Sequence, residues 1–371
     1  MQQPQAKTYF PELDGLRFLA FLLVFIHHAP LLSQNPLWQW LHRYGWMGVD
    51  LFLCLSAYLF TKLLYTEFQQ TGSIHIPYFY IRRTLRIWPL YYLFVIGMLA
   101  LTFFTLPERI DSWRVAGLFT FTDNILSAVF GNYNLILFAG HLWTISYEEQ
   151  FYAVIPWALR SLFKMSQRTR TQIILGVLLV GLIIRIILSL VVKVPYVAIW
   201  VLPVTHFEAI LLGLLVGLGG LDQALARVPP LAAGATGILS LLVIDLLPKT
   251  PIVSAIPLQV YHFFLTGLGM ALILHTLLRV SHKPEWRWIS SRPMAYLGKI
   301  SYGLYVYHLL CLGLASQYVH VAEANYWLWV AAVFLLPLAG TIGVSSLSYS
   351  FIEKPFLRLK ERFAIVLSRP A

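Results

Sequence analysis

Stretches of apolar residues follow one another along nearly the whole chain, with short polar segments between them. An α-helix of about 20 apolar residues is long enough to cross a bilayer. Ten stretches come near that length and predict membrane-spanning helices, at about 16–32, 46–64, 88–106, 143–159, 172–192, 206–219, 231–247, 258–279, 300–319 and 327–351. The pattern therefore predicts an all-α protein, a polytopic transmembrane helical bundle.

An eleventh apolar stretch, at about 113–131, is weaker because polar residues interrupt it. Lysine and arginine decide whether it crosses, since short cytoplasmic loops collect these residues. If it does not cross, most of the 27 basic residues fall on one side of the bilayer. We therefore expect ten spans, a re-entrant or non-crossing segment near 113–131, and both termini in the cytoplasm.

Composition agrees with a membrane protein: 58% of the residues are hydrophobic and 12% are charged, against about a quarter charged in ordinary soluble domains. The net charge of +11 is spread over separate short loops, so it reports topology and does not indicate nucleic-acid binding. We expect one integral, multi-pass membrane domain over 1–371, without an appended soluble domain. Its expected location is a bacterial cytoplasmic membrane.

The first span carries two ionisable residues, Arg17 and His28, eleven positions apart. Eleven helical residues make about three turns, so both side chains fall on one stripe, about 16 Å apart along the axis. Ionisable groups inside a membrane are costly, so each is a candidate functional residue. Two such groups on one face, at two depths, predict a pathway along this helix.

The other polar residues are predicted to gather in two layers when their depth in each span is counted. The layer of His28 holds acidic residues and a second histidine: Asp50, Glu148, Glu149, His206 and Glu208. The layer of Arg17 holds Arg82, Arg83 and Arg86. Clustered arginines suit phosphates, because guanidinium groups donate in pairs and stay charged. A histidine near carboxylates suits general acid–base catalysis, so the layers predict an anion site at the cytoplasmic mouth and a proton-transfer centre farther out.

The chain shows no pattern that predicts a metal site. Two cysteines, Cys54 and Cys311, lie inside predicted spans, and we interpret them as small buried hydrophobic residues. No His and Cys spacing matches a ligand set. We therefore expect no metal.

Several other polar residues in spans receive structural interpretations. A lone intramembrane histidine is often an interhelical hydrogen bonder; three residues are interpreted in this way, and the last of them fits least well: His262, His275 and His308. Glu353 with Lys354 predicts an ion pair and a helix end before Pro355. Arg185 lies in an otherwise apolar span and is unexplained.

Six short motifs follow one another along the chain: Arg17-x10-His28 after Asp14-Gly15-Leu16, Gly48-Val49-Asp50-Leu51-Phe52 with Leu55-Ser56, Arg82-Arg83-x-x-Arg86-Ile87-x-Pro89, His141-Leu142-Trp143-x-x-Ser146-x-Glu148-Glu149-Gln150-Phe151-Tyr152, Leu297-Gly298-x-x-Ser301-Tyr302-x-x-Tyr305-x-x-His308, and Glu353-Lys354-Pro355. In order and spacing this set resembles the acyltransferase 3 family of membrane acyltransferases. The resemblance implies a ten-span enzyme that transfers acyl groups from cytoplasmic acyl-coenzyme A to hydroxyls of cell-surface or secreted glycans, or of small molecules.

The resemblance also implies roles for individual residues. His28 matches the catalytic histidine and Arg17 its partner. Glu149 matches the essential carboxylate, with Glu148 as the alternative. Coenzyme A recognition falls to Arg82, Arg83 and Arg86. We assign acceptor binding to polar and aromatic residues of the same motifs and layer: Asp50, His141, Trp143, Ser146, Glu148, Tyr152 and Glu208.

The expected reaction is a direct transfer. His28 removes the proton from an acceptor hydroxyl as that oxygen attacks the thioester, and Glu149 orients the imidazolium. A covalent acyl intermediate on His28 or Ser146 is the open alternative. The expected donor is acetyl-CoA, and the acceptor is a glycan, a lipid-linked saccharide or a small molecule. Glycan-assembly proteins are candidate partners.

A proton-coupled membrane transporter is the main alternative function, because inward-facing His, Asp and Glu also form proton relays. Transporters often show inverted repeats and paired broken helices, and the sequence shows no such internal symmetry. A non-enzymatic scaffold would need no polar cluster in the outer layer. The motif set therefore favours the acyltransferase interpretation.

Overall fold

The computed structural model describes residues 9–130, 136–189, 196–246, 255–316 and 325–366. Within these ranges the regular elements are helices, and none is a β-strand. Several of the helices are long and apolar. The prediction of an all-α fold is confirmed for the described residues, and the long apolar helices agree with a membrane protein.

The helices of the first half of the chain are α1 (Pro11–His28), α2 (Pro36–Tyr44), α3 (Met47–Thr71), α4 (Ile76–Thr105), α5 (Ser112–Thr120), α6 (Asp123–Phe130), α7 (Trp143–Leu162) and α8 (Gln167–Ile187). Those of the second half are α9 (Tyr196–Val201), α10 (Glu208–Gly217), α11 (Gly220–Ala224), α12 (Pro230–Leu246), α13 (Ala255–Val280), α14 (Arg292–Lys299), α15 (Ser301–Ser316), α17 (Tyr326–Val330), α18 (Leu336–Ser348) and α19 (Lys354–Glu361). Short 3₁₀ turns lie at Pro107–Arg109 (η1), Gly140–Leu142 (η2) and Pro284–Ser290 (η4).

Membrane-length helices account for part of the predicted set of spans. Five described segments are long and apolar enough to cross a membrane: Met47–Thr71, Ile76–Thr105, Gln167–Ile187, Tyr261–Val280 and Tyr326–Glu361. The apolar helices α10 and α12 are shorter. α1 has 18 residues and carries charged side chains in its first half. The structure thus describes five helices of full span length, and the remaining predicted spans correspond to shorter or more polar helices.

The stretch predicted not to cross forms two short helices. α5 has nine residues and α6 has eight, well below the length of about 20 that a span needs. Phe121 lies between them with a left-handed φ of 54°, which ends α5. The part of 113–131 that the structure describes is therefore not a single spanning helix.

The predicted helix end before Pro355 is wrong. Helical structure runs from 326 to 361, through two π-helical segments, Ala331–Leu335 (η5) and Tyr349–Glu353 (η6). Each π segment is followed after one residue by a proline, Pro337 or Pro355. A proline inside a helix removes one hydrogen bond and crowds the preceding turn. A π-helical turn is wider than an α-helical turn, because its hydrogen bonds join residues five positions apart. We infer that the π segments accommodate the prolines and let the helix continue.

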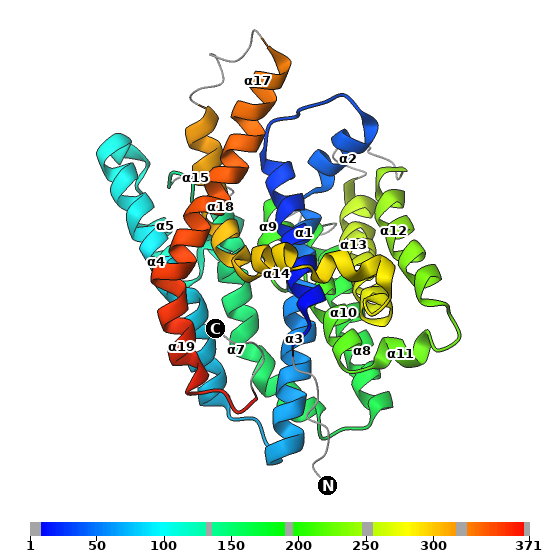
Figure 1. Ribbon diagram of the computed structural model, residues 1–371. Coiled ribbons are helices and arrows are strands. Elements are labelled where there is room, and N and C mark those ends of the chain that lie inside the picture. Colours follow the sequence, from blue (N-terminus) through cyan, green and yellow to red (C-terminus); the bar gives the residue numbers. More distant parts are fainter. Residues whose placement is uncertain (1–8, 131–135, 190–195, 247–254, 317–324, 367–371) are drawn as a thin grey trace.

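α1 lies in the middle of the bundle, against α3, α14 and α15 (Figure 1). Its backbone touches that of α3, because a Cβ atom at Gly48 would collide with the carbonyl oxygen of Ala20. A Cβ atom at Gly298 of α14 would likewise collide with the carbonyl oxygen of Asp14. Small residues allow such close approach where helices pack in a membrane, so these glycines fix the position of α1.

The end of α1 is set by the residues that follow His28. Ala29 is extended, with φ −72° and ψ 159°, and it precedes Pro30, which disfavours helical backbone at the residue before it. The helix therefore stops at His28. This places the His28 side chain in the last turn, next to the open space described below.

We expect Gly48→Ala to destabilise the protein, because the added methyl group must push α1 away from α3. Overpacking of this kind costs about 1–3 kcal/mol. The matched control is Gly97→Ala in α4, where a Cβ atom would meet nothing within 4 Å. Thermal unfolding of both variants in detergent, followed by size-exclusion chromatography, measures the difference. Equal midpoints would contradict the close contact.

Candidate active site

Two cavities open inside the bundle, and α1, α3, α7 and α15 contribute to both. The first, called here the arginine cavity, encloses about 790 Å³ with its open mouth and is lined by Arg17, Val49, Phe52, Leu53, Ser56, Phe60, Arg83, Arg86, Ile87, Thr144, Ile145, Glu148, Tyr152, Ser301, Tyr302 and Tyr305. The second, the histidine cavity, has a volume of about 1220 Å³ with its open mouth and is lined by Val24, His27, His28, Trp46, Val49, Gly140, His141, Trp143, Thr144, Trp200, Tyr305 and Leu309.

Positive charge dominates the arginine cavity. α1 supplies Arg17, and one face of α4 supplies Arg83 and Arg86, three positions apart. The Arg83 guanidinium lies 4.5 Å from the ring centre of Phe60, and Arg17 pairs with Asp14 at 3.2 Å. Within the described part of the chain, Arg83 and Arg86 form no ion pair. Such groups can bind phosphate through charged, planar donors.

Arg82 lies apart from the two other predicted arginines. Its guanidinium pairs with Glu67 of α3 at 3.3 Å and donates to the carbonyl oxygen of Phe363 at 2.7 Å. It is absent from the described lining of the arginine cavity. Neighbouring residues of a helix point about 100° apart, so Arg82 and Arg83 face different surroundings. The contacts of Arg82 tie α3 and α4 to the C-terminal segment.

The histidine cavity contains His28 and an aromatic wall. The His28 side chain is exposed to the cavity, and its Nδ1–H donates to the carbonyl oxygen of Val24 at 2.9 Å. Trp200 contacts Trp46 and Trp143, with ring centres 4.5 and 6.2 Å apart. A basic nitrogen beside aromatic faces can hold and activate a hydroxyl-bearing ring.

The two cavities share a wall made by Val49, Thr144 and Tyr305. The hydroxyl groups of Thr144 and Tyr305 are hydrogen-bonded at 2.6 Å. The Tyr305 hydroxyl also lies 3.1 Å from the carbonyl oxygen of His141. The two cavities therefore adjoin at these residues, with the arginines on one side and His28 on the other.

Glu148 and Glu149 occupy different environments, although the sequence placed them together. Glu148 lines the arginine cavity and accepts a hydrogen bond from Ser56 at 3.4 Å. Glu149 accepts one from the indole N–H of Trp88 at 3.3 Å and lies outside the described linings of both cavities. The predicted contact in which Glu149 orients His28 is absent among the described contacts.

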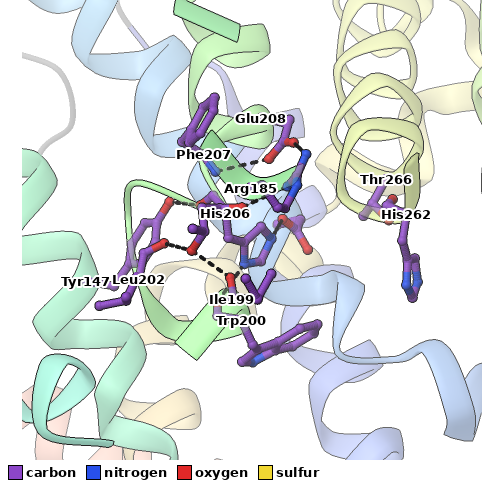
Figure 2. Close-up of polar contacts among 12 residues, drawn as sticks. Tyr147, Arg185, Ile199, Trp200, Leu202, His206, Phe207, Glu208, His262 and Thr266 are labelled. Atoms are coloured by element: carbon purple, nitrogen blue, oxygen red, sulfur yellow. Dashed lines mark hydrogen bonds and ion pairs between the residues drawn. The ribbon is translucent and has the colours of Figure 1, made fainter. Parts of the chain in front are cut away.

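Asp50 and Glu208, predicted to bind the acceptor, belong to a buried network beside the histidine cavity and are absent from the described linings. Arg185 of α8 forms an ion pair with Glu208 and donates to the carbonyl oxygen of Thr205 at 2.8 Å. Figure 2 shows Arg185 directed at Glu208 and at the turn that precedes α10. A carboxylate buried at 2% exposure needs such a partner, which explains the arginine in an otherwise apolar span.

The same network reaches the aromatic wall through His206. Its Nε2 lies 2.8 Å from Asp50 Oδ1, and its Nδ1 lies 3.0 Å from the carbonyl oxygen of Trp200. Both partners are acceptors, so an imidazolium with two N–H groups satisfies both. The hydroxyl group of Tyr147 donates to the carbonyl oxygen of His206 (Figure 2). These contacts tie the turn that carries His206 to the backbone of Trp200 in α9, next to the histidine cavity.

The structure distributes the remaining predicted residues between the cavities and the packed interior. His141 and Trp143 line the histidine cavity, and Tyr152 lines the arginine cavity. Ser146 is fully buried and absent from the described linings.

Sequence reasoning missed Thr144 and Tyr305 of the shared wall, and it treated His308 as structural. The sequence did contain a signal for Tyr305 and His308, because they are three positions apart on one helical face of the motif over 297–308. Here His308 lies 3.3 Å from His28.

Within the described ranges, no group of three or more His, Cys, Asp or Glu residues is placed to hold a metal ion. Cys54 and Cys311 are free thiols. The polar side chains that line the two cavities carry guanidinium, imidazole, carboxylate and hydroxyl groups.

Comparison with known proteins identifies the family of this chain. A family model described as an acyltransferase domain, the acyltransferase 3 model, matches residues 10–346. The peptidoglycan O-acetyltransferase OatA of Listeria monocytogenes is 26% identical over 369 residues, 94% of this chain and 56% of that protein. A putative O-acetyltransferase of Staphylococcus aureus strain COL is 29% identical over 94% of this chain and 57% of its own length.

A third relative, the O-acetyltransferase OatA of Staphylococcus aureus strain NCTC 8325, is 25% identical over 96% of this chain and 58% of its own length. The chain thus spans under three fifths of the length of these relatives. No solved structure matches the chain. The matches cover the whole region that carries the two cavities.

We expect Arg185→Leu to destabilise the protein by about 3–5 kcal/mol, because Glu208 then keeps a buried charge without its partner. The double variant Arg185→Leu with Glu208→Leu removes both charges and is expected to unfold at a higher temperature than the single variant. Thermal unfolding in detergent compares the two. A double variant that is as unstable as Arg185→Leu would show that the ion pair is not the cause.

Proposed function

This chain belongs to the acyltransferase 3 family and is an acyltransferase enzyme, and from this premise we propose that it is a membrane O-acyltransferase. It moves an acyl group, acetyl above all, from cytoplasmic acyl-CoA to a hydroxyl group of an extracytoplasmic glycan. The observation that carries the proposal is the shared wall between a cavity of arginines and a cavity that holds His28. Relatives named O-acetyltransferases support the acetyl group, and one named for peptidoglycan supports a glycan acceptor.

The arginine cavity is proposed to bind the donor. Coenzyme A has a phosphate-rich head and a long flexible arm that ends in a thioester. Arg83 and Arg86, with Arg17 opposite, offer fixed positive charge for the phosphates. The arm then runs toward Thr144 and Tyr305, which places the thioester at the shared wall, within reach of the histidine cavity.

The histidine cavity is proposed to bind the acceptor. Trp143, Trp46 and Trp200 supply apolar ring faces, and His141 supplies polar edges. A sugar ring has both an apolar face and hydroxyl edges, so it fits such a lining. Asp50 pairs with His206 and Glu208 pairs with Arg185. These buried pairs lie beside the cavity, and they influence acceptor binding by holding Trp200 in position.

His28 is proposed as the general base. Its Nε2 takes the proton of the acceptor hydroxyl while the oxygen attacks the thioester carbonyl. The C–S bond then breaks, and the thiolate of coenzyme A takes the proton from His28. This direct transfer needs no covalent enzyme intermediate. Ser146 is buried away from the cavities, which disfavours it as an alternative nucleophile.

We assign the essential carboxylate to Glu148 in place of Glu149. Glu148 lines the same cavity as Arg17 and Arg83. A carboxylate there orients the guanidinium groups and balances their charge before the donor binds. Glu149 lies on another face of α7, against Trp88.

The proposed topology follows the distribution of basic residues. We place ten crossings in a bacterial cytoplasmic membrane, with both termini and the mouth of the arginine cavity in the cytoplasm. Residues 1–371 then act as one membrane domain. Its partners are the lipid bilayer, acyl-CoA, the glycan acceptor and the proteins that assemble that glycan.

We expect purified protein in lipid to release coenzyme A from acetyl-CoA when an acceptor glycan is present. His28→Ala should lower turnover about 100- to 10,000-fold, because it removes the general base. Arg83→Ala should weaken acetyl-CoA binding about tenfold to a hundredfold, because it removes a charged hydrogen-bond donor. Labelled acetyl-CoA measures both turnover and binding.

The control for the second variant is Arg168→Ala, an exposed arginine of α8 outside both cavities. It should bind and turn over acetyl-CoA as the wild type does. Full turnover in His28→Ala, or equal binding in Arg83→Ala and wild type, would refute the proposed roles. Longer acyl homologues tested in the same assay identify the preferred acyl group.

A paired substitution tests the choice of carboxylate. Glu148→Gln should lower kcat/KM about tenfold to a hundredfold, because the arginines lose a charged partner beside the donor. Glu149→Gln keeps a group that can accept from Trp88 and should retain most of the activity. If Glu149→Gln loses the activity instead, the essential carboxylate is Glu149, on the face of α7 that contacts Trp88 of α4.

A further inference from the structure

Two imidazole rings from different helices meet at the edge of the histidine cavity. His28 ends α1, and His308 lies in the middle of α15. The Nε2 atom of His308 is 3.3 Å from the Nδ1 atom of His28, and the ring centres are 5.0 Å apart. His308 is completely buried, whereas His28 is exposed to the cavity. One ring therefore faces the reacting groups, and the other supports it from inside the protein.

Backbone carbonyl groups determine which ring nitrogens carry hydrogen. The Nδ1 atom of His28 faces the carbonyl oxygen of Val24 at 2.9 Å, and the Nδ1 atom of His308 faces that of Tyr305 at 2.5 Å. A carbonyl oxygen only accepts, so each Nδ1 must donate. In a neutral His308 the Nε2 atom then has a lone pair, and it can accept from the Nδ1–H of His28, which it shares with the carbonyl oxygen of Val24 in a bifurcated hydrogen bond.

This arrangement leaves the Nε2 atom of His28 without hydrogen, as a general base requires. When that atom takes a proton, positive charge develops over the whole ring, including Nδ1–H. A lone pair 3.3 Å from Nδ1 stabilises this charge. Within the described residues, no carboxylate forms a hydrogen bond or an ion pair with either ring.

We propose that His308 is the positioning residue of His28: its Nε2 accepts from Nδ1–H, holds the ring toward the cavity and stabilises the imidazolium. This inference rests on the proposed function, because it assigns a partner to the proposed base. His308 thus replaces Glu149, which the family resemblance implied as the partner of His28. A neutral imidazole in this part costs less to bury than a carboxylate does.

Two substitutions of His308 separate this role from packing. In His308→Gln the amide oxygen can reach the position of Nε2 and accept from His28. In His308→Asn the shorter side chain reaches only the position of Nδ1, so it can keep the contact with Tyr305 but loses the one with His28. We expect His308→Asn to lower kcat about 10- to 100-fold with an unchanged KM for acetyl-CoA, and His308→Gln to recover most of kcat.

The control is His275→Asn. His275 lies in α13, 3.4 Å from Asp222 and outside both cavities, so its substitution should leave kcat unchanged.

A second measurement detects the hydrogen bond between His28 and His308 directly. In protein labelled with ¹⁵N-histidine, a scalar coupling should join the Nδ1 of His28 to the Nε2 of His308, and it should vanish in His28→Ala and in His308→Asn.

The outcomes distinguish this inference from the proposed function. Slow turnover in His308→Asn, recovery in His308→Gln and a wild-type coupling support the inference. Wild-type protein that depends on His28 but is unaffected by His308→Asn, or that shows no coupling, overturns the inference and leaves the proposed function in place. An equal loss of kcat in His308→Asn and His308→Gln also overturns it, because it indicates that His308 acts by packing and not by accepting a hydrogen bond. Wild-type protein that does not turn over acetyl-CoA overturns both.

Discussion

The whole structure depends on how polar side chains are satisfied where water is scarce. A buried charge is tolerated when a partner and hydrogen bonds replace its hydration. The described bundle contains four such pairs, each joining separate elements: Arg82 with Glu67, Arg114 with Asp123, Arg185 with Glu208, and His206 with Asp50. These pairs hold neighbouring helices, and the turn that carries His206, in fixed relative positions inside the bundle. Their role is structural, although the sequence analysis predicted several of their members, such as Arg82, Asp50 and Glu208, as site residues.

Several polar groups outside these pairs face the two cavities. Arg83 and Arg86 line one cavity beside Glu148, and His28 is exposed to the other. An arginine that faces open space, with no carboxylate bonded to it, retains its capacity to bind an anion. The contrast between paired and cavity-facing groups therefore separates structural from functional residues of the same chemical type, as Arg82 and Arg83 illustrate.

Close packing of α1 connects this framework to the chemistry. Glycines on α3 and α14 bring their backbones against α1, so Arg17 and His28 are held at fixed positions along one rigid element. Its end at His28 follows from the proline two residues later. The bundle then adds Thr144 and Tyr305, which line both cavities. A donor and an acceptor can thus approach one wall from opposite sides.

Composition and periodicity determined that the protein is a helical membrane protein, and the order of the motifs identified its family. Local spacing also fixed the distance between Arg17 and His28, because both belong to one helix. Only the tertiary structure decided which of two adjacent residues faces a cavity: Arg83 over Arg82, and Glu148 over Glu149. Neighbours on a helix differ by about 100° in direction, and the rotation of a helix is set by packing against distant segments. For the same reason the contact between His28 and His308, 280 positions apart, is a property of the fold and not of any local pattern.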